Sequence, residues 1–236
     1  MKVRFDILRR KNAASKPYMQ SFEYEYENGG MTVAAVLNEL NRREPLKDIN
    51  GEDADLIRWE CSCMQKKCGA CAMLINGRPR LACDAKLSEY GDAIRLEPFR
   101  KFPVVADLIC DRTVIFENLK FIGAWFEKNA EIGENRAALA HESSRCLQCG
   151  CCLEVCPNFS ADTKFKGMAA AVPLSRLLAQ VSEDEKKRIF KAYSKYFYSG
   201  CGKSLACRNI CPAGIDAEML MVNSNAAAIW KRKRKK

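Results

Sequence analysis

Residues 63–71 of the chain read CMQKKCGAC, and a fourth cysteine follows at position 83. The thiols are therefore separated by four, two and eleven residues. Gly69 and Ala70 stand between the second and third cysteines, so the backbone of this loop has room to fold closely around a bound group. The pattern predicts a loop whose thiols converge on one side.

This spacing is that of plant-type ferredoxins. It predicts a [2Fe–2S] cluster bound by Cys63, Cys68, Cys71 and Cys83. The alternative is a structural zinc site, but zinc sites favour two separated Cys-x2–4-Cys pairs, whereas three of these cysteines share one loop. Cys61 lies just before the loop, and we expect it not to be a ligand.

The residues before the loop predict two strands and a helix. Residues 3–8 are β-prone, and residues 18–26 alternate aromatic with polar side chains. Asn28-Gly29-Gly30 is a turn signal. Thr32 is placed to cap a helix. The apolar residues of that helix recur at helical spacing: Val33, Val36, Leu37 and Leu40.

The residues after the loop predict the rest of a sheet. Residues 74–81 read as strand, Asn76-Gly77 turn and strand. Residues 94–98 are a last short strand, and Pro103 ends the basic stretch that follows. We therefore expect a β-grasp ferredoxin domain over residues 1–103.

Helical periodicity replaces strand alternation in the second half. It predicts an α+β protein whose second domain, residues 104–236, is all-helical and bacterial-ferredoxin-like, with two clusters. The segments with apolar residues at three- and four-residue steps are 104–108, 114–125, 136–140, 172–181 and 183–196.

A second cysteine run closes with a proline, Cys156-Pro157, and matches the bacterial ferredoxin pattern Cys-x2-Cys-x2-Cys-x3-Cys-Pro. In two-cluster ferredoxins the fourth cysteine of this run binds the other cluster. The first three cysteines of the run are Cys146, Cys149 and Cys152.

A third run, Cys201-x5-Cys207-x3-Cys211-Pro212, has Ser204 where a middle cysteine would stand. Exchanging the last ligand between the runs predicts two clusters. The [4Fe–4S] ligands would be Cys146, Cys149, Cys152 and Cys211, and the [3Fe–4S] ligands Cys156, Cys201 and Cys207. A fourth iron bound through the Ser204 oxygen is the open alternative.

Three of the 14 cysteines remain outside these sets. Cys61 precedes the first ligand, Cys151 is out of phase with its run, and Cys110 falls on an apolar pattern that we interpret as helical core. We expect none of them to bind a cluster. His141, the only histidine, is expected to be an exposed helix residue.

The composition favours a reducing compartment. The first twelve residues, MKVRFDILRRKN, lack the apolar core of a signal peptide, and no run of about 18 apolar residues occurs. Six of the ten net positive charges lie in Lys231–Lys236, so the remainder carries only +4. We expect no nucleic-acid partner. The tail is either a solvated end or a segment attracted to anionic headgroups.

A plant-type loop followed by a [4Fe–4S]/[3Fe–4S] pair resembles the iron–sulfur subunit of succinate dehydrogenases and fumarate reductases. The resemblance covers nearly the whole chain. It extends beyond the cysteines to Gly69–Met73, Ile75–Gly77, Leu81–Cys83, Glu97–Asp107 and the residues Phe165, Gly167, Ala169 and Ala170.

The resemblance implies a non-catalytic electron-transfer subunit of a succinate:quinone oxidoreductase or quinol:fumarate reductase. It implies a FAD flavoprotein subunit that acts on succinate or fumarate, and a membrane cytochrome b anchor with haem b. Electrons would pass from flavin through the three clusters to quinone. The chain would lie peripherally on the cytoplasmic side of the cell membrane. No G-x-G-x-x-G fingerprint occurs, so the dicarboxylate chemistry is expected on another chain.

Two positions depart from ubiquinone-reducing members of the family. Ala161 and Gly202 stand where many of them have Trp and His. The segment Cys156–Phe159 is closer to fumarate reductases and menaquinone-linked members, so menaquinone is the expected quinone. The alternatives are a soluble, non-quinone fumarate reductase, another flavin dehydrogenase complex, or a zinc scaffold without redox function.

Overall fold

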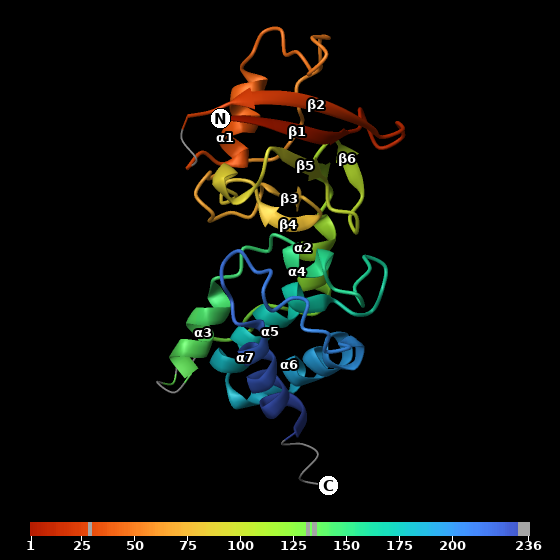
Figure 1. Cartoon of the computed structure of the whole chain (residues 1–236). Helices are drawn as coiled ribbons and strands as arrows, with labels where there is room; N and C mark the ends of the chain where they lie inside the picture. The colour runs from red at the N-terminus through yellow and green to blue at the C-terminus, as the bar shows by residue number, and fades with distance from the viewer. Residues whose placement is uncertain (28–29, 131–132, 134–135, 231–236) are drawn as a thin grey trace. The chain divides into compact units, whose positions relative to one another are not determined.

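Figure 1 shows the computed structural model of the chain, which describes residues 1–27, 30–130, 133 and 136–230. The chain divides into two units, Met1–Asp111 and Arg112–Lys236. The domain boundary expected after residue 103 precedes this division. The predicted turn at Asn28-Gly29 and the basic tail lie outside the described residues.

The first unit is built on a five-stranded sheet with the order β2-β1-β5-β3-β4. β1 and β5 are parallel, and the other neighbours are antiparallel. The strands predicted from alternation and turn signals are therefore confirmed. They are β1 (Lys2–Arg9), β2 (Tyr18–Glu25), β3 (Ala72–Ile75), β4 (Arg78–Leu81) and β5 (Ala93–Glu97).

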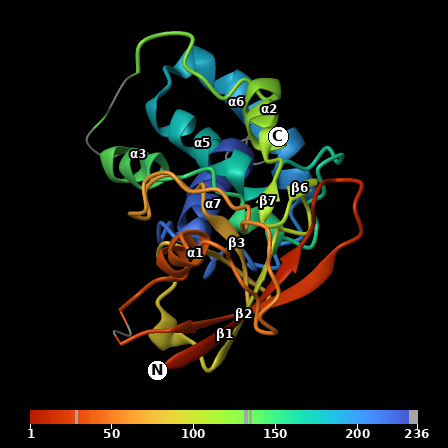
Figure 2. The same cartoon turned by 90° about the horizontal axis from the view of Figure 1, so that it is seen from above.

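One face of this sheet is buried because apolar residues alternate along β1. The next strand, β2, buries only Phe22, so its tyrosines face outward or are half-buried. Helix α1 (Val33–Asn41) begins as predicted: Thr32 Oγ1 accepts a hydrogen bond from Ala35 N at 3.3 Å. Figure 2 shows this helix beside the strands, seen from above. The fully or nearly buried side chains are Val3, Phe5, Ile7, Val33, Val36, Leu37 and Leu40.

Residues 104–110 form a β-hairpin, so the helix predicted for residues 104–108 is wrong. The strands are β6 (Val104–Ala106) and β7 (Ile109–Cys110), and Cys110 therefore lies on a strand rather than in a helix. Asp107 turns the chain between them with φ +41°. Its carboxylate accepts hydrogen bonds from Arg10 N at 2.8 Å and Arg58 N at 2.9 Å. A short apolar run has no decisive periodicity, and these distant contacts select the hairpin.

The second unit is helical, as predicted. Helix α5 is central: it contacts α2, α3, α4, α6 and α7, and nearly all of its residues are buried (Figure 1). Because it is apolar on every side, it needs neighbours all around. The helices are α2 (Thr113–Phe121), α3 (Ala137–Ser144), α4 (Cys151–Glu154), α5 (Gly167–Gln180), α6 (Glu183–Tyr196) and α7 (Ala217–Asn225).

Helix α7 was not predicted. Asp216 accepts a hydrogen bond from Met219 N at 2.9 Å and caps the helix, so an N-cap signal was present in the sequence. The apolar stripe of this helix is weak, with only Leu220 fully buried at its centre. A π-helical turn, η4 (Ala226–Trp230), continues from its end.

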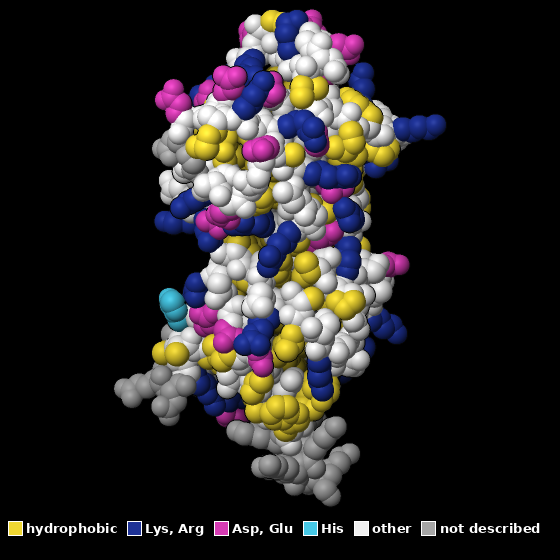
Figure 3. Space-filling model, viewed as in Figure 1, with side chains coloured by type: hydrophobic (Ala, Val, Ile, Leu, Met, Phe, Trp, Pro, Cys, Tyr) yellow, Lys and Arg dark blue, Asp and Glu magenta, His cyan; other side chains and the backbone are white. Residues whose placement is uncertain are grey.

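None of the helices in the described ranges is both long and apolar enough to cross a bilayer. On the face shown in Figure 3, Lys and Arg side chains are interspersed with Asp and Glu and do not gather in one stripe. The mixture agrees with the small net charge of the chain outside its last six residues.

Candidate metal-cluster sites

The first site is formed by the loop before β3 and by the residue that follows β4 near the start of α1. Cys71 directly precedes β3, and Cys83 follows β4, so one hairpin brings the two ends of the motif together. Ala82 N donates to Cys71 O at 3.0 Å, and Ala34 N donates to Ala82 O at 3.0 Å. The helix start and the hairpin therefore hold the fourth predicted ligand beside the loop.

Backbone amides of the loop point at the cysteine sulfurs. Gln65 N and Lys67 N donate to Cys63 Sγ, both at 3.3 Å, and Lys66 N donates to Cys83 Sγ at 3.3 Å. Met64, Lys66 and Gly69 have φ values of 53°, 60° and 76°. Turns of this kind aim successive N–H groups into one concavity that favours negative charge.

The thiols of this loop influence one another. The hydrogen bond from Gln65 N, helped by that from Lys67 N, lowers the pKa of Cys63 to about 7. Burial raises the pKa of Cys71 to about 12, and the neighbouring thiols of Cys83 and Cys68 add to the increase. All four predicted ligands are thus grouped together; Cys61 and Cys68 are exposed, Cys63 and Cys83 are half-buried, and Cys71 is buried.

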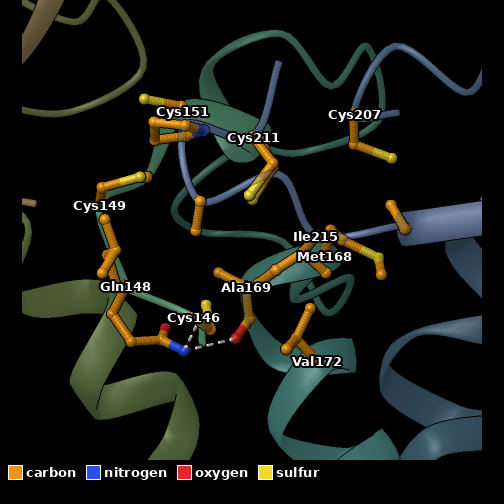
Figure 4. A pocket seen from close by; sticks show the side chains of 16 residues that line it. Cys146, Gln148, Cys149, Cys151, Met168, Ala169, Val172, Cys207, Cys211 and Ile215 are labelled. Carbon is orange, nitrogen blue, oxygen red and sulfur yellow. Dashed lines mark hydrogen bonds between the residues drawn. The ribbon is translucent and has the colours of Figure 1, made fainter. Parts of the chain in front are cut away.

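The second site is a pocket in the helical unit, with about 460 Å³ of space free of protein atoms, part of it open to solvent. Figure 4 shows that residues of the second and third cysteine runs surround this pocket. Cys211 comes from a segment distant from Cys146 in the sequence. Gln148 and Gly150, with φ values of 51° and 88°, bend the run around the pocket. The thiols that line it are Cys146, Cys149, Cys151, Cys152, Cys207 and Cys211.

Burial disfavours the ionised form of these thiols when no cation is nearby. It raises the pKa of Cys146 to about 11 and that of Cys152 well above its usual value. Cys149 differs, because the Cys151 thiol donates a hydrogen bond to it and lowers its pKa to about 7. Iron would supply the missing positive charge, so the donor set and the burial fit a metal cluster.

The third site is a neighbouring pocket with about 380 Å³ of atom-free space, also partly open to solvent. Lys203 and Leu205 have φ values of 58° and 57°, which fold the backbone on either side of Ser204. Cys152 and Cys207 line both pockets, so the two sites adjoin. The other lining residues that bear on chemistry are Cys156, Cys201 and Ser204.

The arrangement of the described side chains does not favour a site for one zinc ion. A structural zinc ion needs four ligands at about 2.0–2.3 Å. In the parts of the chain that the structure describes, no three Cys, His, Asp or Glu side chains are placed to hold one ion. His141 is exposed on α3, as predicted.

Two family models match the chain. A 2Fe-2S iron-sulfur cluster binding domain covers residues 4–117, and a 4Fe-4S dicluster domain covers residues 142–215. The succinate dehydrogenase iron-sulfur subunit of Bacillus subtilis is 36% identical over 223 residues, 90% of this chain and 87% of the relative. The chain belongs to the succinate dehydrogenase/fumarate reductase iron–sulfur subunit family.

Two further comparisons support the family and the fold, respectively. The fumarate reductase iron-sulfur subunit of Escherichia coli O6:H1 is 32% identical, over 85% of this chain and 82% of the relative. A chain of the Mycobacterium smegmatis Sdh1 complex in the apo form has the same fold, with a TM-score of 0.74 at 20% identity, over 95% of this chain and 96% of that one. The [2Fe–2S] and [4Fe–4S] cofactors predicted from the cysteines are those that the domain matches name.

Family membership leaves the roles of several pocket residues open. The cysteine spacing identified neither Gln148, which contacts Cys146, nor Cys151, which contacts Cys149. Arg112 Nη1 donates to Cys149 O at 3.1 Å and was missed as well. No spacing rule signals these residues, because their contacts arise from packing.

Proposed function

We propose that this chain is the electron-transfer subunit of a succinate dehydrogenase/fumarate reductase complex and holds three clusters. The observation that carries the proposal is the pair of adjoining pockets: all four predicted [4Fe–4S] ligands are among the residues lining one, and all three predicted [3Fe–4S] ligands are among those lining the other. The sets are Cys63, Cys68, Cys71 and Cys83 for [2Fe–2S]; Cys146, Cys149, Cys152 and Cys211 for [4Fe–4S]; and Cys156, Cys201 and Cys207 for [3Fe–4S].

The third pocket supports a cluster that lacks one iron. Ser204 lines it beside the three thiols, in the place where the sequence pattern has lost a cysteine. A hydroxyl is a far weaker ligand for iron than a thiolate, since its proton is not lost near neutral pH. Three thiolates fit a cube with one vacant corner.

The proposed fold is a β-grasp ferredoxin domain followed by a two-cluster, bacterial-ferredoxin-like helical domain. When bound, the clusters supply one-electron redox chemistry over a range of potentials. The residues of this chain would hold them, donate N–H groups to sulfur at the first site, and line the second with apolar side chains. Met168, Val172 and Ile215 form that apolar wall.

The proposed partners are a FAD-containing flavoprotein subunit and a membrane cytochrome b anchor with haem b, on the cytoplasmic side of the membrane. The relatives' names, succinate dehydrogenase and fumarate reductase iron-sulfur subunits, support the flavoprotein. A β-carbon at Gly202 would stand 3.1 Å from Asn158 Oδ1, so the residue that is His in ubiquinone-reducing members would fit here only if Asn158 shifted. This supports menaquinone, bound mainly within the anchor.

Iron analysis and EPR spectroscopy of the purified chain test the cluster assignment. We expect about nine iron atoms per chain, the sum of clusters of two, four and three irons. The oxidised sample should show a [3Fe–4S] signal, which Cys201→Ser should abolish while the reduced [2Fe–2S] signal persists. Colourless protein with bound zinc would overturn the assignment.

The partner assignment has its own test. Affinity purification of the tagged chain from its native membranes should recover a flavin-containing subunit and a haem-containing membrane subunit. Fumarate reduction by an artificial donor should survive loss of haem, whereas menaquinol-linked turnover should not. Full quinone-linked turnover in a haem-free complex would contradict the proposed route.

A further inference from the structure

The side chain of Gln148 bridges the first cysteine run and helix α5. Its Nε2 donates hydrogen bonds to Cys146 Sγ at 3.2 Å and to Ala169 O at 3.3 Å (Figure 4). A nitrogen–sulfur distance of 3.2 Å is short for a hydrogen bond to sulfur, because sulfur is larger than oxygen. Gln148 is the side chain whose amide Figure 4 joins by a dashed line to a cysteine sulfur of this pocket.

A proline in α5 explains why the Ala169 carbonyl accepts this bond. In an α-helix the carbonyl of residue 169 accepts from the backbone N–H of residue 173. That residue is Pro173, which has no N–H, so the carbonyl lacks its helical donor. The amide of Gln148 supplies a donor in its place.

The two acceptors fix the orientation of the Gln148 amide. Ala169 O can only accept, and Cys146 Sγ can only accept once it binds iron as a thiolate, so the NH2 group must face them; a flipped amide would place Oε1 against the Ala169 carbonyl. Oε1 instead lies on the other side, buried and without a hydrogen-bond partner among the residues that the structure describes. An unpaired buried oxygen costs free energy, and the bond to the sulfur is retained despite that cost.

We propose that Gln148 sets the reduction potential of the [4Fe–4S] cluster through this hydrogen bond; the proposal rests on the ligand set assigned above. Reduction adds negative charge, part of which resides on the cysteine sulfurs. A donor to Cys146 Sγ therefore stabilises the reduced cluster more than the oxidised one and raises the potential. The pairing of Pro173 with Gln148 holds the donor in place in both redox states.

EPR-monitored potentiometry of Gln148 variants tests the inference. Gln148→Leu removes the donor and should lower the equilibrium constant for reduction about tenfold. For a one-electron couple this lowers the reduction potential by about 59 mV. Gln148→Glu, which has a negative charge and no donor, should lower the reduction potential further than Gln148→Leu does. Gln148→Lys restores a donor with a positive charge and should return the potential to the wild-type value or above.

Two controls separate tuning from a structural role. Gln65→Leu makes the same chemical change beside Cys63, where the backbone N–H is the donor, and should leave the [2Fe–2S] potential unchanged. In every Gln148 variant the [2Fe–2S] potential should also remain at its wild-type value. Purely structural loosening would not produce the order Glu, Leu, Gln, Lys.

The outcomes are distinct. An intact [4Fe–4S] signal with the same potential in the Leu, Glu and Lys variants would overturn the role of Gln148 and leave the cluster assignment standing. A wild-type chain with no [4Fe–4S] signal would overturn the proposed function and this inference together.

Discussion

Asn158 lies so close to Gly202 that a β-carbon added to the glycine would stand 3.1 Å from Asn158 Oδ1 and 3.2 Å from Nδ2. Asn158 Nδ2 also donates to Gly200 O at 2.9 Å. The asparagine therefore occupies the space that a side chain at position 202 would need, on the wall of the third pocket. A side chain at position 202 therefore requires Asn158 to move.

Gly202→Ala should displace Asn158 and break its bond to Gly200. Loss of that bond should lower the free energy of unfolding by about 1 kcal/mol, measured by urea denaturation. In an Asn158→Ala background the same substitution should cost less, because the crowded side chain is gone. Equal costs in both backgrounds would show that the two residues are not coupled.

Ser204→Cys should supply a thiolate at the vacant corner of the third site. The cluster held by Cys156, Cys201 and Cys207 should then gain a fourth iron and lose its oxidised-state [3Fe–4S] EPR signal. Its potential should fall, because an anionic ligand is added. The matched variant Ser204→Ala should keep the [3Fe–4S] signal. An unchanged signal in Ser204→Cys would show that residue 204 does not face the vacant corner.

The three cysteines outside the ligand sets should be replaceable without loss of iron. Cys61 is exposed, Cys110 is buried with its Sγ 3.5 Å from Phe99 O, and Cys151 is fully buried. Replacement of each by alanine should leave iron content and all three EPR signals near wild type. Cys63→Ser is the positive control and should perturb the [2Fe–2S] signal strongly. Loss of that signal in Cys61→Ala alone would mean that the first ligand is misassigned.

Asp107→Asn should destabilise the first unit severely. Arg9 Nε lies 3.1 Å from Asp107 Oδ1, and the exposed side-chain fractions are 2% and 4%. Removing the carboxylate charge leaves the buried guanidinium without its counter-ion, although its Nη atoms still donate to Gln20, Asp55 and Leu56, and should cost about 3–5 kcal/mol. Asparagine tolerates the positive φ of this residue, so the substitution should add no backbone strain. Denaturation of the purified chain measures the loss.

An exposed ion pair in the same sheet is the control for that substitution. Lys2 and Glu23 pair at 2.6 Å with 55% and 39% of their side chains exposed. Glu23→Ala should cost less than about 1 kcal/mol, because solvent screens the pair. Similar losses in the two variants would show that the Arg9–Asp107 pair is not a buried structural element.

Local signals in the sequence were reliable where neighbouring residues decide the structure. Asn76 and Gly77 adopt positive φ values of 49° and 75°, as the predicted two-residue turn requires, and Thr32 caps α1. The prediction failed for residues 104–108, where the apolar run suited either a helix or a strand. Hydrogen bonds from Arg10 and Arg58, far away in the sequence, decide that segment.

The sequence by itself predicted the family, the [2Fe–2S] and [4Fe–4S] cofactors and the candidate ligands, because most ligands of a cluster recur at short fixed spacings. Only the tertiary structure decided which thiols from residues 146–156 and 201–211 line the same pocket, since the packing of both runs around α5 joins segments about 50 residues apart. It also decided the contact of Gln148 with Cys146, which depends on a carbonyl left unpaired by Pro173. Spacing is a local constraint of the chain, whereas the meeting of the two cysteine runs beside α5 depends on how distant segments pack.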